Sequence, residues 1–372
     1  MKTVRIVTVV GARPQFVKAA AVSRAIAAFN AAQRDVQVQE QIVHTGQHYD
    51  PSMSKVFFDE LHIPQPAVNL EVGSGTHGAQ TGQMLQRIEE VLLAGKPEWM
   101  LVYGDTNSTL AGALAAAKLH IPVAHVEAGL RSFNRRMPEE INRIVADCVS
   151  TLLLCPTGTS VVNLTREGIG RGVHEVGDVM YDSVLYNAKL AQKSSKVLTT
   201  LGLERREYYL ATVHRAENTD DPRRLEGILA ALSQLDRPII LPLHPRTRKT
   251  LGAGLAGIKS NVRIIDPVPY LDMLMLEQNA RLILTDSGGV QKEAYWFGCP
   301  CVTLRDETEW VELVQAKCNR LAGADAKAIV QAVNDFEAAD AKLPDDRPKN
   351  LYGDGHAADK VVQLLATTHV TR

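Results

Sequence analysis

The feature that most constrains the fold is an alternation of short, almost wholly apolar runs with longer helical patterns. Runs such as VRIVTVVG (4–11) and EWMLVYGD (98–105) contain few polar residues, and amphipathic stretches such as AQTGQMLQRIEEVLLAG (79–95) lie between them. Strands that are apolar along their whole length are buried on both faces, as happens when helices cover both sides of a parallel sheet. The pattern therefore predicts an α/β protein built on parallel sheets.

The alternation occurs twice along the chain. It weakens at about residues 178–206, where the sequence becomes polar, and restarts with YYLATV (208–213). A chain of 372 residues is long enough for two domains with separate cores. We predict two Rossmann-like domains, at residues 1–178 and 179–355, followed by an amphipathic helix at 356–372.

Composition excludes several classes of function. The formal net charge is −1, so no overall basic field favours nucleic acid or anionic lipid, and any bound anion must be held by a local site. No apolar stretch reaches membrane-spanning length, and the N-terminus resembles a first strand more than a signal peptide. The expectation is a cytoplasmic protein that binds neither nucleic acid nor membrane.

The five cysteines argue against a metal or redox site. Their number is odd, their spacing does not match a zinc site, and the CPC sequence at 299–301 lies in an apolar, strand-like run. We predict buried structural thiols there, no disulfide framework and no metal ligands.

Polar residues gather directly after the apolar runs. In doubly wound sheets ligands bind outside the carboxyl ends of the strands. In both halves of the chain, glycines, charged residues and histidines follow the ends of the apolar runs. The residues are Gly11, Arg13, Lys18, Asp105, His125, Glu127, His214, Arg215, Glu217, His244, Arg246 and Arg305. Solvated loops would scatter such residues, so the pattern indicates a polar cleft between the two domains.

The stretch LTDSGGVQKEA (284–294) runs from an apolar strand into a helix through Ser287, Gly288 and Gly289. Such a turn lets backbone N–H groups at a helix start approach a phosphate, and the helix dipole favours its charge. Glu293, about two turns further on, suits ribose hydroxyls. A plain strand-turn-helix with Asp286 or Ser287 as N-cap explains the same letters. With the neighbouring strand ends, the stretch favours a nucleotide diphosphate, whereas the absence of GxGxxG disfavours NAD.

Two carboxylates are well placed for acid–base chemistry. Asp105 and Glu127 each end an apolar run beside a glycine. By contrast, Glu139 and Glu140 follow Pro138 in the first turn of a helix, where helix capping explains them.

The remaining charges and histidines of these segments have more ordinary readings. For Glu140, Arg135 and Arg136 we expect solvated ion pairs. His214 is a candidate because Arg215 and Glu217 follow it at once, whereas His125 is interpreted as packing.

The motifs together resemble a known family. They are GARPQFVK, HTGQHYD, YGDTNSTLAGALAA, HVEAGLRS, PEEINR, HRAEN, HPRT, LTDSGGVQKEA and YGDG, in that order. Over residues 3–365 the chain closely resembles the non-hydrolysing UDP-N-acetylglucosamine 2-epimerases. The resemblance implies a GT-B-like pair of Rossmann-like domains with the active-site cleft between them, a C-terminal helix that returns to the first domain, a homodimer and no cofactor.

The resemblance also implies roles for individual residues. Catalytic roles fall on Asp105, Glu127, Glu139 and His214. Contacts with the UDP-sugar fall on Arg13, Lys18, Arg143, His244, Ser287, Gly288, Gly289, Glu293 and Arg305. The implied reaction eliminates UDP to leave a 2-acetamidoglucal and then adds UDP back, interconverting UDP-N-acetylglucosamine and UDP-N-acetylmannosamine.

Alternatives stay open. Similar motifs occur in relatives that epimerise UDP-2,3-diacetamido-2,3-dideoxyglucuronic acid for surface polysaccharide synthesis, and such a uronate needs one more cation, for which Arg131, Arg135 and Arg136 are candidates. A GT-B glycosyltransferase and a catalytically silent UDP-sugar binder are further possibilities. Residues 47–50 lack the arginine that some members use at an activating UDP-N-acetylglucosamine site. Tyr270 or Met273 stands in for an aromatic residue that stacks on uracil in some members.

Overall fold

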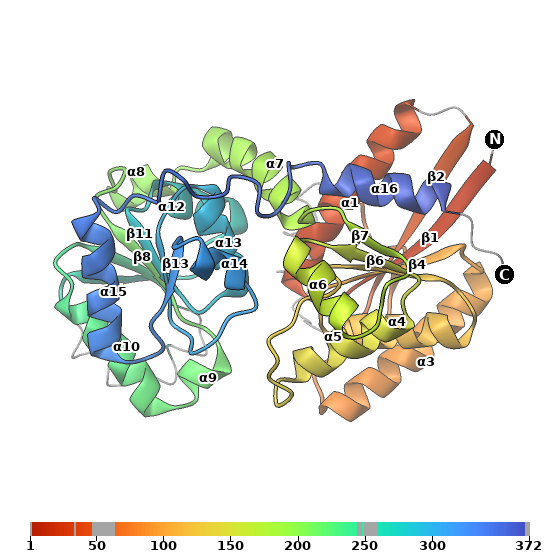
Figure 1. Cartoon of the computed structure of the whole chain (residues 1–372), viewed down its shortest axis with the longest axis horizontal. Coiled ribbons are helices and arrows are strands. Elements are labelled where there is room, and N and C mark those ends of the chain that lie inside the picture. Colours follow the sequence, from red (N-terminus) through yellow and green to blue (C-terminus); the bar gives the residue numbers. More distant parts are fainter. Residues whose placement is uncertain (1, 33–34, 47–63, 244–247, 249–258, 369–372) are drawn as a thin grey trace. The chain divides into compact units, whose positions relative to one another are not determined.

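The computed structural model describes residues 2–32, 35–46, 64–243, 248 and 259–368 (Figure 1). The chain divides into two compact units, one formed by Met1–Leu185 with Asn350–Arg372 and the other by Tyr186–Lys349. The sequence had placed these boundaries after residues 178 and 355. The first boundary differs because the division after Leu185 falls inside helix α7 (Val179–Ser194), which is continuous. Its first turns are bonded into the first unit, where the Ser183 hydroxyl donates to the Val17 carbonyl.

The first unit is built on a seven-stranded parallel sheet with the order β3-β2-β1-β4-β5-β6-β7. Its strands are β1 (Lys2–Val10), β2 (Val36–His44), β3 (Val68–Asn69), β4 (Trp99–Tyr103), β5 (Val123–Val126), β6 (Leu152–Cys155) and β7 (Val173–Glu175). Its other helices are α1 (Arg13–Ala32), α3 (His77–Gly95), α4 (Asn107–Lys118), α5 (Pro138–Val149), α6 (Gly158–Arg166) and α16 (Ala357–Thr367). Helices cover both faces, as the apolar strands predict.

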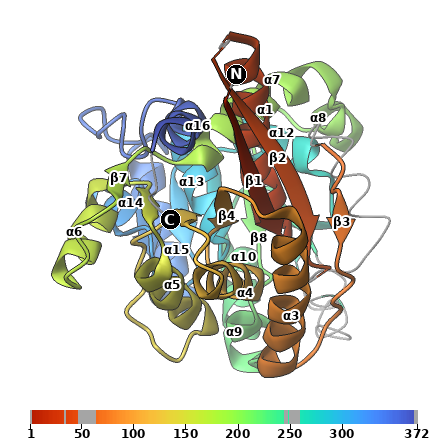
Figure 2. The ribbon, with the colours of Figure 1, turned by 90° about the vertical axis from the view of Figure 1, so that its right-hand side faces the viewer.

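Within this unit, α16 packs against α1, while α3, α4 and α5 lie on the other side of the sheet (Figures 1 and 2). The core below α3 joins Met84, Ile88 and Leu92 to Val102 of β4. Strand order reverses between β1 and β4, so their carboxyl ends diverge into connections on opposite faces of the sheet. That reversal is where doubly wound sheets bind ligands.

The second unit repeats the plan with a six-stranded parallel sheet ordered β10-β9-β8-β11-β12-β13. Its strands are β8 (Tyr209–Thr212), β9 (Ile239–Pro242), β10 (Val262–Ile265), β11 (Leu282–Thr285), β12 (Cys301–Thr303) and β13 (Asn319–Leu321). Its helices include α8 (Val197–Leu201), α9 (Ala216–Thr219), α10 (Pro222–Gln234), α12 (Tyr270–Asn279), α13 (Gly288–Trp296), α14 (Val311–Gln315) and α15 (Ala326–Ala338). The predicted fold class, α/β with two Rossmann-like parallel-sheet domains, is confirmed.

The cysteines of the second unit are packing residues. Cys299 and Cys301 are free, buried thiols, which confirms the structural reading of the CPC sequence. Burial raises the pKa of Cys301 to about 12, so its unreactive thiol form dominates near neutral pH. None of the helices in the described ranges is long and apolar enough to cross a membrane.

Asp182 of α7 holds the start of α16. Its carboxylate accepts hydrogen bonds from the backbone N–H groups of Ala357 (3.2 Å) and Ala358 (2.7 Å). Burial raises the pKa of Asp182 to about 6 despite these bonds, and the carboxylates of Asp178 and Asp359 add to the rise. The pKa in the folded protein thus exceeds the unfolded value, so this residue's favourable contribution is present at low pH and is lost as pH rises through about 6.

We therefore expect the difference in unfolding free energy between the native protein and Asp182→Asn to depend on pH. Urea titrations should show the native protein losing up to about 3 kcal/mol relative to the variant between about pH 4 and about pH 7. Asp345→Asn, at an exposed position of the second unit, is the control and should show no such trend. If the native protein does not lose stability relative to Asp182→Asn as the pH rises, or gains it, the raised pKa of Asp182 is ruled out.

Candidate functional site

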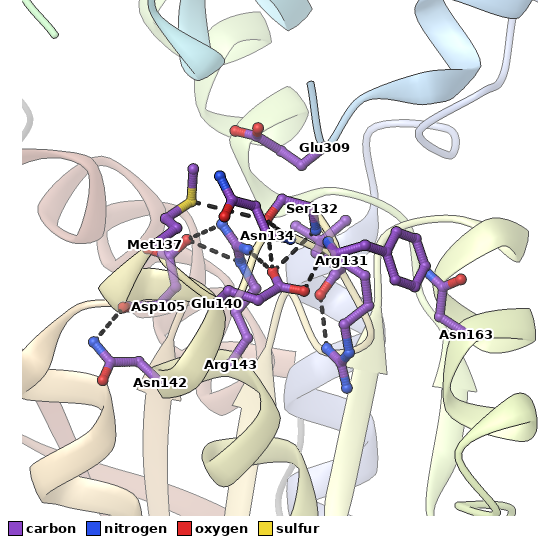
Figure 3. A network of polar contacts seen from close by, with 12 residues as sticks. Asp105, Arg131, Ser132, Asn134, Met137, Glu140, Asn142, Arg143, Asn163 and Glu309 are labelled. Carbon is purple, nitrogen blue, oxygen red and sulfur yellow. Dashed lines mark hydrogen bonds and ion pairs between the residues drawn. The ribbon is translucent and has the colours of Figure 1, made fainter. Parts of the chain in front are cut away.

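Asp105 lies just beyond β4 and is held by an arginine. Its Oδ2 accepts hydrogen bonds from Nε (3.1 Å) and Nη2 (2.8 Å) of Arg143, which comes from α5 (Figure 3). The Asn142 amide donates to the Asp105 carbonyl (2.9 Å), so both the backbone and the side chain of Asp105 are tied to α5. The Asp105 side chain keeps 32% of its surface exposed, which leaves it open to a ligand.

Glu127 lies just beyond β5, next to β4 in the sheet. Its buried carboxylate pairs with the Lys18 ammonium of α1. A Cβ at Gly104 would come within 3.2 Å of Glu127 Oε2 and 3.6 Å of Lys18 Nζ, so this pair lies against the residue that precedes Asp105. The backbone of Glu127 is left-handed (φ 70°), a conformation that costs a non-glycine residue about 1 kcal/mol or more and is concentrated at functional sites.

The two adjacent glutamates of α5 have different roles. Glu139 is exposed at the helix start. Glu140 is fully buried, pairs with Arg143 Nη1 and accepts hydrogen bonds from the N–H groups of Ser132 (2.9 Å) and Phe133 (2.9 Å) (Figure 3). The predicted solvated ion pair for Glu140 is therefore wrong. Neighbouring residues of a helix point in different directions, so Glu140 is buried while Glu139 is not. The buried Glu140 orders the loop after β5.

Arg131 and His125 belong to a buried network that the sequence did not reveal. Arg131 donates through Nε and Nη2 to Glu167 (2.7 Å each), and through Nη1 to Asp147 and the Leu130 carbonyl. Its guanidinium is thus committed and is no candidate for a uronate carboxylate. Burial of His125 agrees with the packing reading, but its ring is hydrogen-bonded on both sides. The available signal was a histidine inside an otherwise apolar strand.

The turn after β1 is tightly packed. A Cβ at Gly11 would lie 2.2 Å from both Thr45 Oγ1 and Ser108 Oγ, so only glycine fits there. The Gln15 side chain accepts from the N–H groups of Gly11 (2.8 Å) and Ala12 (3.1 Å) at the start of α1. The side chain of Arg13 lies outside the described residues, as do residues 47–50 and His244.

In the second unit, the LTDSGG turn is built as the sequence suggested. Ser287 is the N-cap of α13, and its hydroxyl accepts from the Val290 N–H at 3.5 Å. Asp286 is buried and accepts from the N–H groups of His214 (3.1 Å) and Arg215 (3.0 Å). It therefore joins the ends of β8 and β11, while the His214 side chain stays half exposed.

A carboxylate sits at the start of α13 between two arginines. Glu309 Oε2 lies 2.9 Å from Nη1 of the buried Arg305, and Glu309 Oε1 lies 3.8 Å from Arg215 Nη2. A Cβ at Gly288 would meet the same Oε1 at 2.7 Å. The guanidinium of Arg305 makes no hydrogen bond of good geometry within the described part of the chain. Two arginines and a helix N-terminus thus surround one anionic group, which is the environment of an anion site.

Further along α13, Glu293 is buried and accepts a hydrogen bond from the Tyr270 hydroxyl (3.1 Å). Lys292 is also buried, and its Nζ lies 3.9 Å from the ring centroid of Trp310. Of the two candidates for uracil stacking, Tyr270 is thus tied to Glu293, whereas Met273 packs at the edge of the core.

Comparisons with known proteins identify the family to which the chain is similar. The family model described as UDP-N-acetylglucosamine 2-epimerase matches residues 30–366. A UDP-N-acetylglucosamine 2-epimerase homolog from Methanococcus maripaludis is 52% identical over 97% of this chain and 99% of its own length. The UDP-2,3-diacetamido-2,3-dideoxy-D-glucuronate 2-epimerase of Pseudomonas aeruginosa is 51% identical over the same shares. The crystal structure of the Methanocaldococcus jannaschii UDP-GlcNAc 2-epimerase with UDP-GlcNAc and UDP matches with a TM-score of 0.86 and 43% identity, covering 97% of this chain and 99% of that one.

Proposed function

Since the chain belongs to the UDP-N-acetylglucosamine 2-epimerase family, we propose that it interconverts UDP-N-acetylglucosamine and UDP-N-acetylmannosamine. The observation on which this rests is the pair of carboxylates at the ends of neighbouring strands, Asp105 and Glu127, each beside one cation. A carboxylate can accept a proton from carbon, and the paired cation holds it in a fixed position at the strand end. Inverting C2 requires groups that remove and return a proton on opposite faces of the sugar.

The proposed reaction proceeds by elimination and re-addition. A carboxylate takes the proton from C2 while the C1–O bond to UDP breaks, leaving 2-acetamidoglucal and UDP. UDP then adds back at C1 as a proton returns to the other face of C2. The C2 proton is only weakly acidic, so the site must above all stabilise the departing diphosphate. The chemistry uses side chains alone, with Glu139 and His214 as the further acid–base groups that the family resemblance implies.

The diphosphate is assigned to the second unit. The N–H groups at the start of α13, preceded by Ser287, and the Arg305 guanidinium offer the donors that a diphosphate needs. Glu309 holds the position of an anion among these donors. Glu293, about one and a half turns along the same helix, is assigned to the ribose hydroxyls.

If Glu309 competes with the diphosphate, Glu309→Gln should tighten UDP binding. We expect the dissociation constant to fall about tenfold, which corresponds to about 1.4 kcal/mol, in isothermal titration calorimetry. The matched control is Asp306→Asn, which removes an exposed acid three residues away and should leave UDP affinity unchanged. Weaker binding by Glu309→Gln would mean that Glu309 instead holds Arg305 in place for UDP.

A second candidate substrate is the UDP-diacetamido uronate. The Pseudomonas relative named for that sugar is 51% identical to this chain, against 45% for the Methanocaldococcus relative named UDP-N-acetylglucosamine 2-epimerase. A uronate adds a carboxylate at C6, which requires a cation. Arg135 and Arg136 are exposed on the loop that Glu140 orders, and they are the arginines of that loop that suit this role.

A direct comparison tests both substrates. The purified protein is incubated with each UDP-sugar separately, without any acceptor, and products are identified by proton NMR. The proposal expects UDP-N-acetylmannosamine from the first. Turnover of the uronate alone, abolished in Arg135→Ala/Arg136→Ala, would move the assignment to the second. Failure with both sugars would return the glycosyltransferase alternative. The homodimer and the cytoplasmic location implied at the sequence level remain predictions.

A further inference from the structure

His125 lies in β5 with no exposed surface, and both of its ring nitrogens face hydrogen-bond partners. Nε2 is 2.7 Å from the Gly104 carbonyl oxygen, and Nδ1 is 2.7 Å from Asp147 Oδ1. A carbonyl oxygen can only accept a hydrogen bond, so Nε2 must carry a proton. The protonation of Nδ1 depends on the state of Asp147.

Asp147 is arranged as an ionised acceptor. Its Oδ2 accepts from the Gly129 N–H (3.0 Å) and from Arg131 Nη1 (2.7 Å), while Oδ1 faces His125. The Arg131 guanidinium favours the ionised form of this buried carboxylate. An ionised carboxylate donates no proton, so Nδ1–H of His125 must donate to it. The ring is therefore an imidazolium.

The four side chains form a row of alternating charge, in the order Glu167, Arg131, Asp147 and His125. Arg131 bridges two carboxylates, and Asp147 bridges two cations. Arg131, Asp147 and His125 are buried. Such ionic networks are weak evidence of stabilisation, because removing the charges from water costs about as much as the pairing returns. Stability alone therefore does not explain the row, and its contact with the backbone at Gly104 indicates another role.

The row ends on the carbonyl of Gly104, the residue directly before Asp105. Gly104 has a left-handed backbone (φ 61°), and its N–H donates to the Val126 carbonyl (3.0 Å), directly before Glu127. The His125 ring thus holds the turn after β4, which carries Asp105 and is hydrogen-bonded to the end of β5 beside Glu127. We propose that His125, held as an imidazolium by Asp147, is a positioning residue that sets the geometry of Asp105 relative to Glu127. The functional part of this proposal rests on the proposed epimerase activity.

The charge state is tested on the native protein by nitrogen-15 NMR of the histidine rings. The proposal expects two N–H groups on the His125 ring near neutral pH. Asp147→Asn removes the carboxylate and should leave one N–H, directed at Gly104. A single N–H in the native protein would overturn the assignment of an imidazolium.

Positioning is tested with two substitutions of His125. His125→Gln keeps a donor that can reach Gly104, whereas His125→Phe keeps an aromatic ring without donors. We expect kcat to fall about 100-fold in His125→Phe, with partial recovery in His125→Gln and KM within about threefold of the native value. UDP affinity, which is assigned to the second unit, should not change. Amide resonances of α16, in the same unit as His125, should keep their native positions and report that this unit is folded. If His125→Phe kept the native kcat, His125 would be a packing residue without a positioning role.

A readout without turnover separates this proposal from the proposed function. Backbone amide resonances of Gly104, Asp105 and Glu127 should shift in His125→Gln, while those of α16 should not. If the native protein epimerises neither sugar but these shifts appear, the proposed function fails, and what stands is the structural part of the proposal, that His125 sets the backbone at Gly104 and Asp105. If the shifts are absent, the positioning role fails whatever the activity.

Discussion

Glu127→Gln will lower kcat by about a thousandfold, within the range that a positioned acid–base group contributes. The substitution preserves shape and the left-handed backbone at this position but removes the negative charge that Lys18 faces. An amide cannot take the C2 proton, so both epimerisation and hydrogen exchange at C2 are lost together. Steady-state kinetics and proton NMR of the sugar measure the two effects.

The matched control for this experiment is Glu98→Gln, in the same unit. Glu98 pairs with Arg5 at a solvent-exposed position, so the same chemical change should leave kcat unchanged. UDP affinity should stay at the native value in both variants. If Glu127→Gln retained kcat within about tenfold of the native protein, Glu127 would not be an acid–base residue.

Arg305→Met will weaken UDP binding by about 100-fold, because charge-assisted hydrogen bonds to a buried anion are each worth about 1.5–3 kcal/mol. Part of the loss in the single variant comes from leaving Glu309 without its nearest cation. The double variant Arg305→Met/Glu309→Gln removes that contribution, and calorimetry of the four proteins gives the coupling between the two residues.

Arg305→Lys and Arg237→Met complete this set. Lysine keeps the charge but loses the fork of donors, so its affinity should fall between those of the native protein and Arg305→Met. Arg237 pairs with Glu207 near the surface of the same unit, and its loss should not affect UDP. UDP binding of native strength by Arg305→Met would exclude Arg305 from the diphosphate site.

The sequence predicted the sheets well because burial on both faces leaves a direct trace in the apolar runs. It also predicted that Asp105, Glu127 and Ser287 lie just beyond strands, since each closely follows such a run. The sequence placed the first domain boundary after residue 178, whereas the first unit extends to Leu185, inside helix α7. Helix α7 is continuous there, and only tertiary contacts such as those of Ser183 show where one unit ends.

Other features depend on partners distant in the chain, which no local pattern shows. Glu139 and Glu140 have the same chemistry, and only packing distinguishes the exposed residue from the buried one that orders the loop. Arg131 reads as a spare cation until Asp147 and Glu167 are seen around it. The role of His125 requires the Gly104 carbonyl, just beyond the end of the neighbouring strand β4 and 21 residues away in sequence.

The most direct test of the proposed chemistry is proton NMR of the native protein with UDP-N-acetylglucosamine in deuterated water, with no acceptor or cofactor added. The account predicts that UDP-N-acetylmannosamine appears and that its C2 carries deuterium, because the removed proton is replaced from solvent. Epimerised product that retains the original hydrogen at C2 would contradict proton removal by a side chain that exchanges with solvent. Unchanged, undeuterated UDP-N-acetylglucosamine would contradict the proposed substrate itself.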